Sequence, residues 1–177
     1  LALFSVFVGD VCSNQIDNIM VRINNDEIYV TTNFIPDSNF IESITAGVSK
    51  EVVFYIDLFR IWNVWPNEFV KGAKIMRILK SDPIKREYSV ITFDNNQTIE
   101  KRFKDISGML SWGLTITDYK ITNIKDLEPG SYFIKVTVES NIKRLPPFVG
   151  YFLFFLSQSE FTVSKKSHRF MINPLSN

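Results

Sequence analysis

The sequence has little of two residue types on which many functional sites depend. Its 177 residues include one cysteine, Cys12, and one histidine, His168. A single cysteine excludes an intramolecular disulfide and a thiolate zinc cluster, and a single histidine excludes a metal motif built on two histidines. A Ser-His-Asp triad would depend on His168, which we expect to be an exposed residue of a basic loop. The sequence therefore predicts a protein that is not an enzyme, with no catalytic residue, no cofactor and no metal site.

Glycine and net charge are also scarce. Seven glycines against 16 phenylalanines argue against glycine-rich phosphate loops and against low-complexity disorder. Twenty basic residues balance 19 acidic ones, so no strong overall field attracts the chain to nucleic acid or to an anionic membrane. We therefore expect no nucleic-acid partner. No internal stretch reaches the roughly 18 apolar residues of a transmembrane helix.

The N-terminal residues LALFSVFVGDV are mostly apolar, which is typical of the hydrophobic part of an export signal. They predict an exported protein of the periplasm or cell envelope, in which residues 1–15 are a signal remnant, residues 16–173 one domain and residues 174–177 a tail. Two alternatives stay open, a lipid anchor on Cys12 and a first strand. Whether the segment is cleaved or retained as an anchor is equally open.

The apolar pattern of the first half predicts strands around one short helix. Residues 16–34 alternate about an Asn-Asn-Asp turn, which is typical of a hairpin. A helix capped by Ser38 or Asn39 is expected to end at Gly47. Residues 51–65 carry apolar side chains on both faces, which predicts a central strand.

The second half repeats this pattern. Further strands are expected at residues 71–79, 87–93, 98–102, 114–121 and 132–138. The last of these has the clearest alternation, with Tyr132, Ile134, Val136 and Val138 on the face that we expect to point inward. A second helix is expected between Phe103 and Gly113.

These elements predict a mainly β fold, an antiparallel β-sandwich that is immunoglobulin-like in general architecture and has two or three short helices. A parallel doubly wound sheet is the weaker alternative, because it needs a helix between most strand pairs. The third helix is expected at residues 146–156, where it would cover the domain. Tyr151, Phe154 and Phe155 lie off its apolar stripe and are candidates for a contact surface.

Two features of residues 51–69 have alternative interpretations. Trp62, Trp65 and Phe69 form an aromatic cluster that either packs in the core or at a sheet edge, or forms an apolar lip for a peptide or ligand. Asp57 lies among apolar residues, so it needs a partner if it is buried. Arg60 or Arg77 could supply that partner, and a ligand contact is the alternative.

The segment SDPIKREYSV at residues 81–90 resembles a motif of the bacterial domain of unknown function 4390 family. The block Arg144-Leu145-Pro146-Pro147, the aromatic run that follows it and the closing Phe170 are similar to the end of that family's sequences, and residues 56–65 fit as well. The resemblance covers residues 16–173 and departs at residues 157–166, where the family tends to carry Trp and Asp. It implies an exported envelope protein and assigns no activity and no site residue.

We therefore interpret the chain as a non-enzymatic interaction module of the periplasm or cell envelope, with an envelope protein as the expected partner. The alternative is a carrier or binder of a lipid or another apolar ligand, and a peripheral membrane contact is open. The candidate surface consists of Trp62, Trp65, Phe69, Tyr151, Phe154 and Phe155.

Overall fold

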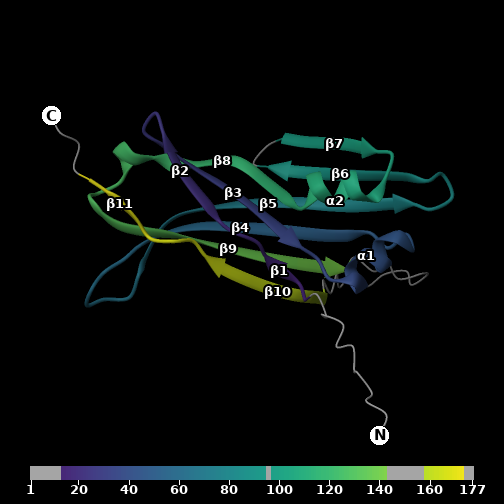
Figure 1. The fold of residues 1–177 in the computed structure, drawn as a ribbon, viewed down its shortest axis with the longest axis horizontal. Coiled ribbons are helices and arrows are strands. Elements are labelled where there is room, and N and C mark those ends of the chain that lie inside the picture. The colour runs from purple at the N-terminus through teal and green to yellow at the C-terminus, as the bar shows by residue number, and fades with distance from the viewer. Residues whose placement is uncertain (1–12, 95–96, 143–157, 174–177) are drawn as a thin grey trace, which may run out of the picture.

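The chain folds into two antiparallel β-sheets with two α-helices, as a computed structural model that describes residues 13–94, 97–142 and 158–173 shows (Figure 1). The four-stranded sheet contains β1 (Gln15–Ile16), β2 (Met20–Asn24), β3 (Glu27–Ile35) and β8 (Thr115–Asn123). The seven-stranded sheet has the order β10-β9-β4-β5-β6-β7, with β11 also paired to β9. Its strands are β4 (Lys50–Arg60), β5 (Glu68–Asp82), β6 (Glu87–Asp94), β7 (Gln97–Phe103), β9 (Gly130–Ile142), β10 (Gln158–Lys166) and β11 (Phe170–Ile172). The mainly β, antiparallel prediction is confirmed.

The predicted first hairpin is present, and its turn residues explain its register. Asn25 and Asp26 have φ angles of 48° and 61°, which a two-residue hairpin turn requires and which Asn and Asp tolerate. The turn pairs Asn24 with Glu27, so Ile28, Val30 and Phe34 all point to the buried face of β3.

Both helices are present, and one cap differs from the prediction. Helix α1 (Ser38–Thr45) is capped by Asp37, not by Ser38 or Asn39, because the Asp37 carboxylate accepts the Phe40 N–H at 2.8 Å. The Asn14 side chain donates to the other carboxylate oxygen at 3.0 Å and holds the cap in place. Helix α2 (Ile106–Gly113) ends at Gly113, as predicted. A 3₁₀ turn, Ile124–Asp126, follows β8. No helix in the described part of the chain is long and apolar enough to cross a bilayer.

The core lies between the two sheets. Its centre is formed by fully buried side chains of β4 and β9, namely Phe54, Ile56, Leu58, Ile134, Val136 and Val138. Strand β4 is internal because it pairs with both β5 and β9, and the predicted inward face of β9 is confirmed.

The predicted extension of β4 to residue 65 is wrong. The strand ends at Arg60 and residues 61–67 form a loop, which includes Pro66, a residue without an N–H for the ladder.

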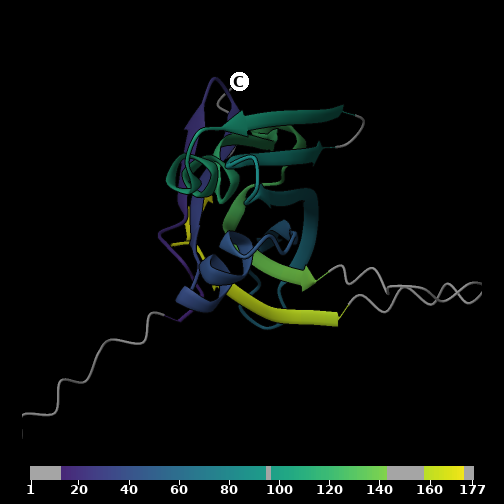
Figure 2. The same ribbon diagram turned by 90° about the vertical axis from the view of Figure 1, so that its right-hand side faces the viewer.

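The seven-stranded sheet is strongly curved, with the four-stranded sheet and the helices inside its curve (Figure 2). The side chains of β4 alternate between this inner face and the outer face, over which no described helix or strand lies. The predicted helix at residues 146–156 and the segment 1–12 lie outside the described residues. The outer face and the two ends of the sheets are therefore the surfaces on which a site can be sought.

Candidate functional site

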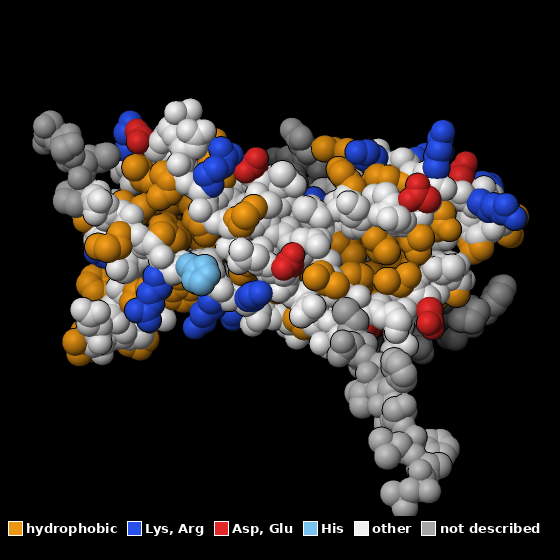
Figure 3. All heavy atoms as spheres, viewed as in Figure 1, with side chains coloured by type: hydrophobic (Ala, Val, Ile, Leu, Met, Phe, Trp, Pro, Cys, Tyr) orange, Lys and Arg blue, Asp and Glu red, His pale blue; other side chains and the backbone are white. Residues whose placement is uncertain are grey.

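The hairpin of β4 and β5 carries the densest group of exposed large apolar side chains at one end of the molecule. Its loop projects beyond the other strands at the lower left of Figure 1, and hydrophobic side chains gather at the same end in Figure 3. The group, called the hairpin tip below, consists of Trp62, Val64, Trp65, Phe69 and Val70, which are 42%, 87%, 74%, 57% and 37% exposed. Isolated apolar side chains are common on protein surfaces, but a contiguous group marks a contact site.

Polar contacts hold the base of the hairpin tip. The Arg60 guanidinium lies over the Trp62 ring at 4.3 Å, forms an ion pair with Glu128 and donates to the Pro129 carbonyl at 3.0 Å. The Trp62 indole N–H donates to the Glu68 carboxylate at 3.0 Å. These contacts fix the base of the hairpin tip, while Val64 and Trp65 project farther into solvent.

The structure separates the predicted site residues into two groups. Trp62, Trp65 and Phe69 come together on one hairpin and are exposed, so the interpretation as core packing is wrong for them. The reason is that Trp62 and Trp65 lie in the loop beyond the end of β4, while Phe69 pairs with Phe59 on the outer face of the sheet, over which no described helix or strand lies. Tyr151, Phe154 and Phe155 lie outside the described residues.

An aromatic row joins the hairpin tip to the outer face of the seven-stranded sheet. Phe59 pairs across the ladder with both Phe69 and Phe133. The Phe59 and Phe133 rings stack at 5.3 Å between centroids with an interplanar angle of 10°, and Phe69 meets Phe59 edge-on at 5.8 Å. This row connects the most exposed ring, Phe69, to the buried Phe133.

A charged row follows the aromatic row on the same face. Asp57 pairs in register with Lys135, and Lys135 with Lys166. The Lys166 ammonium lies 5.0 Å from the centre of the Phe133 ring. One position farther along this face Lys74 lies over Tyr55, with the ammonium 5.7 Å from the ring centre. Cations therefore border the aromatic surface.

Asp57 is placed against a glycine. A Cβ at Gly72 would lie 2.6 Å from Asp57 Oδ1 and 3.1 Å from the Phe69 ring, so Gly72 provides the space that both groups occupy. Burial raises the pKa of the Asp57 carboxyl, and the nearby Lys135 lowers it in part. Acids whose pKa is raised by burial are frequent at functional sites, although they also occur elsewhere.

The predicted pairing of Asp57 with Arg60 or Arg77 is wrong. Asp57 points to the outer face, whereas the two arginines lie on the inner face, because Arg60 and Asp57 are an odd number of residues apart and Arg77 pairs with Val52. Arg77 instead donates to the carbonyls of Trp112, Gly113 and Thr115 at 2.9, 3.0 and 2.7 Å. It therefore holds the end of α2.

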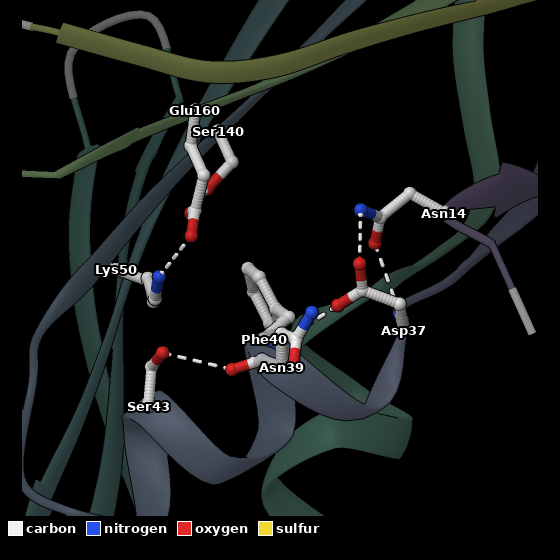
Figure 4. Close-up of polar contacts among 8 residues, drawn as sticks. All are labelled: Asn14, Asp37, Asn39, Phe40, Ser43, Lys50, Ser140 and Glu160. Atoms are coloured by element: carbon white, nitrogen blue, oxygen red, sulfur yellow. Dashed lines mark hydrogen bonds and ion pairs between the residues drawn. The ribbon is translucent and has the colours of Figure 1, made fainter. Parts of the chain in front are cut away.

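A second polar group lies beside α1 (Figure 4), at the end of the molecule opposite the hairpin tip (Figure 1). Lys50 is fully buried, and its ammonium lies 2.6 Å from Glu160 Oε1 and 5.5 Å from the centre of the Phe40 ring. The Ser140 hydroxyl donates to Glu160 Oε2 at 3.1 Å. Glu160 reaches this position because it lies in an irregularity of the β9–β10 ladder between Ser159 and Phe161. With both Lys50 and Ser140 at 0% exposure, the group is a structural ion pair.

His168 is exposed in the connection between β10 and β11, as predicted. No group of three or more His, Cys, Asp or Glu residues in the described ranges could hold a metal ion. The sequence interpretation did not include Val64, Val70 or the lysines of the outer face. For the lysines, the alternation along β5, β9 and β10 was the available signal, but their common face appears only once the strands are paired.

Comparison with known proteins places the chain in a family. A family model described as "Domain of unknown function (DUF4390)" matches residues 13–168. No curated protein and no solved structure gives a significant match. The match includes every residue of the hairpin tip and of both outer-face rows. Since it spans most of the 177 residues, the chain belongs to the DUF4390 family.

Proposed function

We propose that the protein is a non-enzymatic interaction module of the cell envelope and that the hairpin tip is its contact surface. The observation that carries this proposal is the gathering of Trp62, Val64, Trp65, Phe69 and Val70 on one projecting hairpin. Tryptophan is among the residues that contribute most to binding, because its large ring buries much apolar area when a partner covers it.

The architecture supports a binding role. The proposed immunoglobulin-like β-sandwich is a scaffold in which two packed sheets hold the loops at either end. Here the Arg60 contacts with Glu128 and Pro129 tie the base of the hairpin tip to the start of β9. A base fixed in this way limits the conformational entropy that the hairpin loses on binding. The envelope location rests on the apolar composition of residues 1–11.

Site-specific photo-crosslinking in living cells tests the proposal. A photoreactive amino acid replaces Val64, which is 87% exposed, or Ile84, which is 94% exposed and lies in the β5–β6 turn. Both positions are solvent-facing, so neither substitution should disturb the core. We expect a crosslinked product from position 64 and none from position 84. Equal crosslinking at both positions, or none at position 64, would contradict the proposal.

A further inference from the structure

We propose that the partner of the hairpin tip is the surface of an anionic lipid bilayer, into which the tip inserts while the outer-face lysines contact lipid headgroups. This inference rests on the proposed function, because it identifies what covers the same surface. Three observations carry it: the chemistry of the tip, the charge beside it and the order of the two along the sheet.

The chemistry of the hairpin tip suits the boundary between lipid headgroups and acyl chains. Tryptophan prefers this boundary because its ring is apolar and its N–H is polar. Trp62 and Trp65 are both exposed, and Val64 lies between them at 87% exposure. The tip also projects, so it can enter a flat surface without a collision of the remaining strands (Figure 1).

The charge beside the hairpin tip is positive although the whole chain is nearly neutral. The charged row and Lys74 together contain three cations, Lys74, Lys135 and Lys166, and one anion, Asp57, which gives a charge of +2 next to the aromatic row. The next acid on this face, Glu139, lies farther from the hairpin tip and bonds to Tyr55. Among the described residues no salt bridge involves these three lysines, and Lys135 has only a longer-range interaction with Asp57. Of the two acids at the base, Glu128 is paired with Arg60, whereas Glu68 is bonded to the neutral Trp62 N–H and keeps its charge. Anionic lipid attracts such a local basic group, with screening over roughly 10 Å.

The order of these groups matches the layers of a membrane surface. Side chains two residues apart on one face of a strand are separated by about 7 Å. Lys135 therefore lies about 7 Å behind Phe133, on the side away from the hairpin tip. Lys135 pairs with Asp57, three residues before the end of β4, and therefore lies about 10 Å behind the start of the loop that carries Val64 and Trp65. Interfacial protein elements are buried about 5–10 Å deep, so insertion of this loop leaves the lysines outside the acyl region, where their side chains face the headgroups. A second copy of the chain is a poorer occupant, because its own lysines would face these lysines.

Co-sedimentation of the full chain with vesicles tests the inference. The vesicles contain either phosphatidylcholine alone or a mixture with phosphatidylglycerol. We expect binding to the anionic vesicles that weakens as salt rises, since screening shortens the reach of the lysines. Replacement of Lys135 and Lys166 by Gln should lower this partitioning by about fivefold for each lysine. Val64→Ser/Trp65→Ser should lower it by about tenfold or more, because it removes the inserted apolar surface.

The matched control is Ile84→Ser, which removes an equally exposed apolar side chain from a turn outside the tip and should leave partitioning unchanged. The melting temperature of each variant identifies any loss that comes from unfolding. Equal vesicle binding by wild type and Val64→Ser/Trp65→Ser would overturn the inference. Equal binding by wild type and the variant with Gln at positions 135 and 166 would also overturn it. If wild type fails to bind vesicles while position 64 crosslinks to a protein, the lipid inference fails and the proposed function stands. If both fail, the hairpin tip is not a contact surface.

Discussion

Lys50 and Glu160 form an ion pair whose partners differ in their access to water, and this difference predicts an asymmetric response to mutation. The Lys50 side chain is 0% exposed, whereas the Glu160 side chain is 26% exposed. Glu160→Gln would leave a buried ammonium opposite a neutral amide. Loss of one partner of a fully buried pair costs about 3–5 kcal/mol, and the partial exposure of Glu160 reduces this to about 2–4 kcal/mol.

The reverse substitution should cost less. Lys50→Met removes the buried charge and keeps most of the apolar stem, and the remaining Glu160 carboxylate can turn toward water. We expect a change of about 1 kcal/mol or less, of either sign. The double variant should lie close to Lys50→Met, because neither charge then remains in the protein interior.

Urea unfolding followed by far-UV circular dichroism measures these differences, with constant m-values as the check on two-state behaviour. Glu100→Gln is the control, because the Glu100 and Arg102 side chains are 49% and 72% exposed. Exposed pairs of this kind contribute about 0.5 kcal/mol or less. The reasoning is refuted if Glu160→Gln costs no more than Glu100→Gln, or if Lys50→Met costs more than Glu160→Gln.

Three further predictions concern other positions. Val136→Asp should destabilise the protein by several kcal/mol in the same assay, because Val136 is fully buried and its new charge would be unpaired; wild-type stability would show that β9 does not face the core. Asp57→Asn should raise the melting temperature at pH 7. Burial raises the pKa of Asp57, so at pH values above this folded-state pKa the ionised carboxylate lowers the stability of the wild type. The rise in melting temperature should therefore shrink as pH falls toward the ordinary pKa of 3.8, and a rise that is independent of pH would exclude this cause. His168→Ala should leave the melting temperature unchanged, and a large decrease would contradict its exposed position.

Local structure was predictable where neighbouring residues determine it. The β2–β3 turn follows from Asn25 and Asp26, which accept positive φ angles. The end of α2 follows in the same way from Gly113 and the apolar spacing before it. The cap of α1 was misplaced by one or two residues because Ser38, Asn39 and Asp37 are all suitable caps. Asp37 is the one that also bonds to Asn14, which is 23 residues away, and no local pattern indicates this contact.

The candidate site depended on tertiary structure. An aromatic cluster at Trp62, Trp65 and Phe69 was recognisable, but whether it is core or surface depends on where β4 ends and on which face of the sheet Phe69 lies. The partner of Lys50 lies 110 residues away and reaches it through an irregularity in the ladder, which no local pattern indicates. Arg77 could not be excluded as a partner of Asp57 because the pairing of β4 with β5 was unknown, whereas the odd spacing of Arg60 from Asp57 along β4 was already visible in the sequence.

The central claim is that the hairpin tip is exposed in the free protein and covered in the envelope. Trp112→Phe leaves Trp62 and Trp65 as the two tryptophans of the chain, so their fluorescence reports on the tip alone. Acrylamide quenching of this variant, measured before and after addition of envelope membranes, tests the claim most directly. We predict strong quenching of the free protein, and a blue shift with weaker quenching once membranes are added. Weak quenching of the free protein, or quenching that membranes do not change, would contradict the account.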